Sequence, residues 1–130
     1  MIDPRATALD KLLTAHPELL QGASLVAIFR ALHGAYLAHL KSCVLSIQQT
    51  FKPDAEPWLQ GGYALNDSIA TQTDVAIVFA TKHREETLAQ MAVAVQQLKE
   101  GGYLIVTAAN ELGAPSLERR GGELLGRVSS

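Results

Sequence analysis

The chain has 130 residues, with 11 Lys and Arg against 13 Asp and Glu, so its formal net charge at pH 7 is -2. Hydrophobic residues make up 48% of the chain and charged residues 18%, which is typical of a globular domain and excludes a disordered chain. We expect a single domain over residues 1–130. The near-neutral balance also excludes strong, purely charge-driven binding of nucleic acid by this chain alone.

Other classes of protein are excluded by simple counts. The single cysteine, Cys43, cannot form an internal disulfide, and its apolar surroundings predict a buried structural thiol. No apolar run reaches the ~18 residues that a membrane span requires. The first residues are not a basic segment followed by an apolar core, so they are not a signal peptide. We therefore expect a cytoplasmic protein without a membrane partner.

The first half of the chain predicts helices and strands in alternation. Asp3 before Pro4 is typical of a helix N-cap, and His16–Pro17 ends the helix that follows. The expected elements are a helix over 4–15, a short helical turn at 19–22, a buried strand over 23–29, a helical segment over 34–40, a strand over 43–47 and a helix over 53–59. Residues 63–72 are expected to form a loop with a short strand near 63–65.

The second half shows clearer patterns. The run DVAIVFA predicts a strand over 74–80, and YLIVTA predicts another over 103–108. Between them the spacing predicts a helix over 85–99, which Gly101–Gly102 would end. Its expected core face consists of Leu88, Met91, Ala92, Val95 and Leu98. A loop is expected over 110–116, followed by a short helix over 116–125.

This alternation predicts an α/β fold: a mostly parallel sheet with helices on both faces, joined by right-handed crossovers. The last predicted helix runs into Gly126, where another strand would be due. We therefore expect a fold that is truncated before its closing strands.

Three segments carry a family resemblance. Residues 12–27 resemble the leading helix, glycine turn and first strand of a class I S-adenosylmethionine-dependent methyltransferase, and Thr73–Phe79 resembles its fourth strand. The stretch LKEGGYLIV, residues 98–106, looks like the step into the fifth strand of that family. Lys82 followed by Asn110-Glu111-x-Gly113 is similar to the N-terminal domain of ribosomal RNA guanine-N2 methyltransferases.

The resemblance covers residues 12–130 and implies a Rossmann-like methyltransferase fold. Proteins of that family resemble two methyltransferase folds in tandem, of which the N-terminal copy has no cofactor site. The resemblance therefore implies that S-adenosylmethionine is bound by a catalytic domain elsewhere and not by this chain. It also implies ribosomal RNA and that catalytic domain as partners.

The residues at three motif positions agree with a lost cofactor site. The turn after the first strand reads IFRALHG, so Phe29 and Arg30 stand where glycines would face the cofactor, and only Gly34 remains. The second strand ends on Gln48, which lacks the charge of the usual ribose-binding carboxylate. Residues 80–83 read ATKH in place of the Asn/Asp-Pro-Pro-aromatic motif that holds a target amine. We expect neither catalytic nor cofactor-binding residues in this chain.

Basic residues give the remaining candidates. Lys82, His83 and Arg84 follow a strand at its carboxyl end, where they would contact RNA phosphates or a partner domain, or else form a solvated helix start. Asn110 and Glu111 are implied as functional by the resemblance, although capping of the loop and the next helix is the role that the residues themselves favour. The other candidates for RNA or partner contact are Arg119 and Arg120, on an exposed helix face. Four scattered histidines and one cysteine predict no metal site, and Trp58 is expected to be a half-buried helix aromatic.

Three hypotheses stay open at this point. The first is a cofactor-free methyltransferase-like domain that scaffolds or recognises RNA. The second is an active small methyltransferase in which Gly34, Gln48 and Lys82 are the surviving site elements. The third is a non-enzymatic interaction module or homodimer, joined through an exposed sheet edge. A nicotinamide-binding domain is disfavoured because no G-x-G-x-x-G follows a strand.

Overall fold

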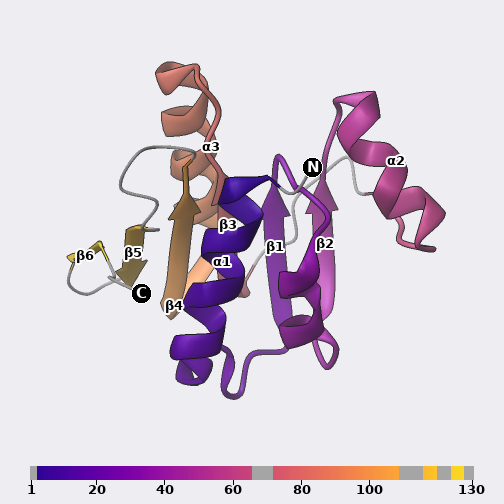
Figure 1. Cartoon of the computed structure of the whole chain (residues 1–130). Coiled ribbons are helices and arrows are strands. Elements are labelled where there is room, and N and C mark those ends of the chain that lie inside the picture. Colours follow the sequence, from indigo (N-terminus) through magenta and orange to yellow (C-terminus); the bar gives the residue numbers. More distant parts are fainter. Residues whose placement is uncertain (1–2, 66–71, 109–115, 120–123, 128–130) are drawn as a thin grey trace.

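The computed structural model describes residues 3–65, 72–108, 116–119 and 124–127. Helices and strands alternate through the first hundred residues, as Figure 1 shows. The elements are α1 (Pro4–Ala15), η1 (Pro17–Leu20), β1 (Leu25–Phe29), η2 (Ala35–Leu40), β2 (Val44–Gln48), α2 (Lys52–Gln60), β3 (Thr73–Phe79), α3 (Arg84–Gln97), β4 (Leu98–Thr107), β5 (Ser116–Arg119) and β6 (Leu124–Arg127), where η denotes a 3-10 helix.

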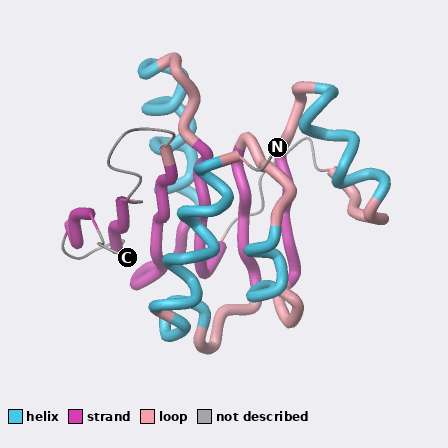
Figure 2. Tube along the Cα trace, viewed as in Figure 1, coloured by secondary structure: helices cyan, strands magenta, loops and turns pink. Residues whose placement is uncertain are grey.

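The strands form one sheet in the order β2-β1-β3-β4-β5-β6. Its first four strands are parallel, β5 pairs antiparallel with β4, and β6 pairs antiparallel with β5. Figure 2 shows where the helices lie relative to these strands. The predicted α/β class with a mostly parallel sheet is confirmed. The helix expected over 116–125 is wrong, because residues 116–119 and 124–127 are short strands. The chain thus adds antiparallel strands where the sequence led us to expect none.

The N-terminal helix is fixed by its cap and by its apolar side. The Asp3 carboxylate accepts a hydrogen bond from the Arg5 backbone amide at 2.8 Å, and Pro4 starts the helix. The buried side consists of Ala6, Leu9, Leu12 and Leu13. It packs with η2 onto one face of the sheet, over residues such as Val26, Ile28 and Ile77. In Figure 1 α1 lies in front of the strands.

The other face of the sheet is covered by α3, and here the predicted core face is wrong. Ala94 is the buried residue of α3 and Met91 is partly buried, whereas Leu88 is 49% exposed and Val95 is 37% exposed. Ala94 packs with a group of sheet residues that includes Ala27 and Ala76. A small side chain at position 94 lets the helix lie close to the sheet there. Leu98 is buried, but it already belongs to β4.

Two further boundaries differ from expectation. Gly101 and Gly102 lie inside β4 and do not end α3, because the helix passes directly into the strand at Leu98. The described residues 63–65 are not a strand, and the rest of that predicted loop, 66–71, lies outside the described residues.

Gly102 is required by the close approach of β3. A Cβ atom there would lie 2.8 Å from the Asp74 carbonyl oxygen and 2.8 Å from Leu98 Cδ1. We expect Gly102→Ala to lower the free energy of unfolding by about 1–3 kcal/mol, as overpacking does, measured by urea denaturation. The control is Gly22→Asn, at a φ of +78° with open space around it, which should change stability by less than about 1 kcal/mol. Equal stability of the Gly102 variant and wild type would contradict this account.

Candidate functional site

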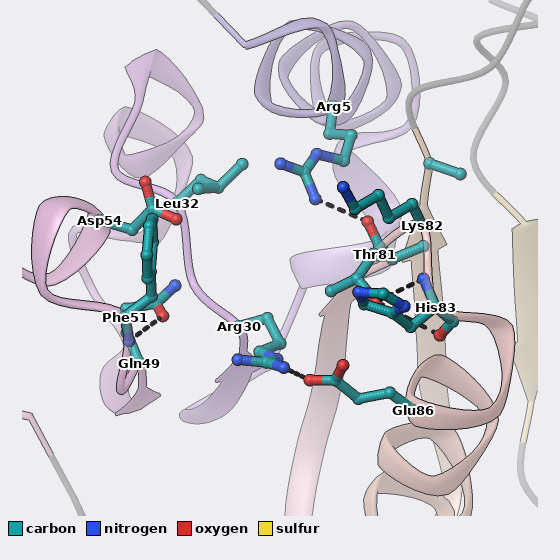
Figure 3. A pocket seen from close by; sticks show the side chains of 12 residues that line it. Arg5, Arg30, Leu32, Gln49, Phe51, Asp54, Thr81, Lys82, His83 and Glu86 are labelled. Atoms are coloured by element: carbon teal, nitrogen blue, oxygen red, sulfur yellow. Dashed lines mark hydrogen bonds and ion pairs between the residues drawn. The ribbon is translucent and has the colours of Figure 1, made fainter.

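A cavity of about 710 Å³ lies at the carboxyl ends of the four parallel strands (Figure 3). In open α/β sheets this end of the strands is where ligands bind. The segments that follow β1, β2, β3 and β4 all contribute to it, together with the first turns of α1, α2 and α3. The lining residues are Arg5, Arg30, Leu32, Gln49, Phe51, Asp54, Ala80, Thr81, Lys82, His83, Glu86 and Ala108.

Arg30 is the first residue after β1, and it has an unusual backbone. Its φ is +56°, in the left-handed region that favours glycine. The guanidinium Nη2 forms an ion pair with Glu86 of α3, and both side chains are about 30% exposed. Arg30 Nε is buried and finds no hydrogen-bond partner among the described residues. The turn therefore keeps a glycine-like conformation while a large charged side chain fills the space beside it.

The Ala31 carbonyl oxygen fixes the next part of the turn. It accepts hydrogen bonds from Gln49 Nε2 at 2.9 Å and from Trp58 Nε1 at 3.0 Å. Gln49 Oε1 in turn accepts from the Phe51 backbone amide at 2.9 Å. Both ends of the Gln49 amide are thus used inside the protein, so this side chain acts as a structural brace between β1, β2 and α2.

Arg5 closes the cavity from the side of α1. Its Nη1 donates to the Ala80 carbonyl oxygen at 2.6 Å, and its Nε and Nη2 donate to the two carboxylate oxygens of Asp3 at 3.0 and 2.9 Å. These hydrogen bonds hold the pKa of Asp3 below its usual value, although partial burial opposes them. A guanidinium has five N–H donors, so two remain beyond these three bonds.

The segment after β3 is held by threonine side chains. The Thr81 amide donates to Thr87 Oγ1 at 3.0 Å, and the His83 amide donates to Thr81 Oγ1 at 3.2 Å. Lys82 and His83 stand exposed on this braced segment and line the cavity. Arg5 lines the cavity too, and Figure 3 draws Arg5 and Lys82 on the same side of it. This wall therefore gathers positive charge from two distant parts of the sequence.

The opposite wall is formed by Leu32 and by the start of α2. Phe51 is 57% exposed although it is a large aromatic side chain, and Asp54 is half-buried beside it. In Figure 3 these two residues face Arg5 and Lys82 across the cavity, with the Arg30–Glu86 pair below. The cavity thus has one aromatic and acidic wall and one basic wall.

The predicted site residues divide into three groups. Arg30, Lys82 and His83 line the cavity. Four others do not line it: Phe29, Gly34, Gln48 and Arg84. Phe29 is buried in the core between the sheet and α3, and Gly34 packs near Ala6. The Gln48 carbonyl accepts a hydrogen bond from the Ala31 amide, and Arg84 is exposed at the start of α3. Arg119 lies in β5, and Asn110, Glu111 and Arg120 lie outside the described residues.

Nine of the twelve lining residues were not predicted as site residues, and the charged, amide and aromatic ones among these are Arg5, Gln49, Phe51, Asp54 and Glu86. Two of these could have been found from the sequence. Glu86 follows the predicted Lys82 by four residues, and Gln49 directly follows Gln48, the residue that we expected at the end of the second strand. Trp58 was also placed wrongly, since it is fully buried and not half-buried. Cys43 is partly buried, with its Sγ 3.6 Å from the Ala23 carbonyl oxygen.

Two negative findings apply to the described part of the chain. No cluster of three His, Cys, Asp or Glu side chains there could hold a metal ion. Within the same ranges no helix has the length and apolar character to cross a membrane.

The sheet, its helices and the cavity at the carboxyl ends of its strands define an α/β domain with a Rossmann-like methyltransferase fold. Residues 13–128 match the family model described as methyltransferase small domain N-terminal. This match spans most of the chain, so the chain belongs to that family.

A solved structure, DesVI from Streptomyces venezuelae, superposes with a TM-score of 0.60 over 82% of this chain at 14% sequence identity. At this identity the likeness shows the fold alone. The match covers 52% of the DesVI chain, so this chain spans about half the length of that structure. Comparison with curated protein sequences gives no match.

Proposed function

We propose that this chain is a methyltransferase-like domain that does no chemistry itself and helps a catalytic domain recognise RNA. The catalytic partner would be an S-adenosylmethionine-dependent ribosomal RNA guanine-N2 methyltransferase domain, acting in the cytoplasm. The observation that carries the proposal is Arg30, which takes the glycine-like conformation of the turn after β1 and pairs with Glu86 across the floor of the cavity.

The residues of the cavity do not fit S-adenosylmethionine. The Arg30 side chain stands where the cofactor requires bare backbone. The Gln49 amide just after β2 is held by its hydrogen bonds with Ala31 and Phe51, and it lacks the negative charge with which a carboxylate binds ribose hydroxyls. The sulfonium of the cofactor is positively charged, and Lys82, which lines the cavity, would oppose it. We therefore derive no methyl transfer in this domain.

The contribution to RNA recognition is supported by the braced segment after β3. Lys82 and His83 are exposed there, at the edge of a ligand-sized cavity. Basic side chains on a fixed backbone position a nucleic acid through its phosphates. A fold of this kind does not define an activity by itself, so the proposal depends on these side chains and on the filled turn.

Asp54 favours a second candidate function, an active methyltransferase with an atypical site. Its half-buried carboxylate lines the cavity close to the end of β2, where a ribose-binding acid would serve. In that case Asp54 would replace the carboxylate that is missing from β2. The two candidates differ in whether the chain binds S-adenosylmethionine.

Thermal unfolding with and without S-adenosylmethionine separates them. We expect no change in Tm up to millimolar cofactor, with S-adenosylhomocysteine as the matched neutral-sulfur ligand. A ligand at a hundred times its Kd would stabilise the fold by about 2.7 kcal/mol, which raises Tm by roughly 4 °C or more in a domain of this size. Such a rise, if abolished by Asp54→Asn, would establish the active alternative.

A further inference from the structure

The cavity has two facing walls of different chemistry. An exposed phenylalanine, Phe51, stands opposite the exposed side chains of Lys82 and His83, and Asp54 stands beside the ring. A single exposed apolar side chain is ordinary on a protein surface, so the relevant feature of Phe51 is that it lines the cavity. The volume of about 710 Å³ lies in the roughly 300–1,000 Å³ range of small-molecule sites.

We propose that this cavity binds one ribonucleotide unit, with its base on Phe51 and its phosphate at Lys82. This inference rests on the proposed function, because it requires that S-adenosylmethionine does not occupy the cavity. The unit could be a free nucleoside monophosphate or one nucleotide of a single-stranded RNA, since both present the same base, ribose and phosphate.

The base is assigned to Phe51 by exposure and position. Its backbone amide is tied to Gln49 Oε1 at 2.9 Å, and α2 begins at the next residue, so the ring is carried on a fixed backbone. A planar aromatic surface on a fixed backbone stacks any base, because every base has a π-face. Leu32 extends the same wall with an apolar side chain.

The phosphate is assigned to the basic wall. Lys82 forms no ion pair with any residue in the described ranges, and Arg5 keeps two N–H donors beyond its bonds to Asp3 and Ala80. Arg30 is already neutralised by Glu86. A phosphate placed here would therefore meet one ammonium without a counter-charge and the unused edge of a guanidinium, which is the chemistry that binds phosphoryl oxygens.

Asp54 explains why the sugar should be ribose. Its carboxylate stands beside Phe51 on the wall opposite Lys82, and a carboxylate accepts hydrogen bonds but gives none. The ribose 2′-hydroxyl is the group by which a protein distinguishes RNA from DNA. An acid here repels phosphate and accepts from a hydroxyl, so it orients the nucleotide with its sugar toward α2 and its phosphate toward Lys82.

The test is fluorescence anisotropy of a labelled single-stranded RNA heptamer, with adenosine 5′-monophosphate as the free nucleotide and a DNA heptamer of the same sequence. We expect Phe51→Ala to weaken RNA binding by roughly 5- to 150-fold, the range for loss of one base–aromatic stack. Lys82→Ala should weaken binding and lower the salt slope by about 0.7. Asp54→Asn should reduce the preference for RNA over DNA.

Matched controls are exposed side chains that do not line the cavity. Leu59→Ala removes an equally exposed apolar side chain from α2, 56% exposed, and Glu56→Gln removes an exposed acid there; neither lines the cavity. Lys11→Ala is the control for Lys82. Each variant is checked for an unchanged Tm, so that loss of binding is not loss of fold.

The outcomes are distinct. Competition by adenosine monophosphate against RNA, with loss in Phe51→Ala but not in Leu59→Ala, supports the inference. Binding of adenosine monophosphate without RNA assigns the free nucleotide as the source. RNA binding that Phe51→Ala leaves unchanged, or no binding of either ligand at millimolar concentration, overturns the inference and leaves the cofactor-free proposal standing. Stabilisation by S-adenosylmethionine overturns the proposed function itself.

Discussion

Replacing Trp58 with alanine is expected to lower the free energy of unfolding by about 3–5 kcal/mol, the usual cost of removing a buried tryptophan side chain. The indole is fully buried, and its Nε1 donates to the Ala31 carbonyl oxygen at 3.0 Å. The rings of His33 and Tyr63 pack edge-on against it at centroid distances of 5.1 and 5.2 Å. Native domains are stable by only about 5–15 kcal/mol, so this change removes a large share of the total.

Trp58→Phe is the matched control. It keeps most of the ring volume and loses only the N–H, while Gln49 continues to donate to the Ala31 carbonyl oxygen. We expect the free energy of unfolding to fall by about 1 kcal/mol for the lost hydrogen bond. The space that the smaller ring leaves unfilled adds to this loss. Urea denaturation followed by circular dichroism measures both. Equal losses in the two variants would show that the hydrogen bond, and not the packing, is what Trp58 supplies.

Asp74→Ala is expected to have the second large effect. The Asp74 side chain is about 10% exposed, and Oδ2 accepts from the backbone amides of Ser24 and Leu25, both at 2.9 Å, and from Ser24 Oγ at 3.1 Å. Oδ1 pairs with Lys99. Truncation leaves two amides at the start of β1 without their acceptor, at about 1–3 kcal/mol each. We expect a loss of roughly 2–6 kcal/mol in urea denaturation.

The same carboxylate makes stability depend on pH. Burial raises the pKa of Asp74. The hydrogen bonds from Lys99, from the two amides and from the Ser24 hydroxyl lower it by more than burial raises it, so the pKa of Asp74 lies well below the usual value. A depressed pKa in the folded state means that the stabilisation is complete above the unfolded pKa of about 3.9 and is lost as the pH falls toward the folded pKa.

The wild-type protein should therefore lose stability steadily as the pH falls below about 5. Asp74→Asn should be less stable at neutral pH and show a flatter profile between pH 5 and pH 2. The exposed Glu56→Gln variant is the control, and it should follow the wild type. Parallel profiles for wild type and Asp74→Asn would show that other acids carry the pH dependence.

Most of the sheet could be predicted because its strands are short apolar runs between turn residues. Local signals of this kind located α1, β1, β2 and β3 to within about two residues. The face of α3 could not be predicted by the same logic. Leu88 and Val95 follow a helical stripe, yet the helix turns Ala94 inward, onto a sheet face that includes Ala27 and Ala76 as well as larger side chains. Periodicity indicates that a helix has an apolar stripe, but the shape of the opposing surface decides which side is buried.

Of the residues that line the cavity, only those that directly follow a strand could be predicted from the sequence. Lys82 and His83 follow β3 directly, and the missing glycines around Arg30 were visible in the sequence. Arg5 was not accessible in this way, because it reaches Ala80 across 75 positions of sequence. Phe51 and Asp54 read locally as the start of a helix, and their exposure toward the cavity depends on how α2 is braced by Gln49 and Trp58.

The first turn of α1 is tied to the cavity at two points, since Arg5 donates to Ala80 and its carbonyl accepts from Thr107 Oγ1 at 2.9 Å. The helix therefore links the segment that follows β3 to the last residue of β4. Trimming the chain by a few residues at this end would remove a helix cap, a cavity wall and the link between these two places at once. A reporter group attached near Thr7, which is exposed on the same turn, would in turn sense whatever enters the cavity.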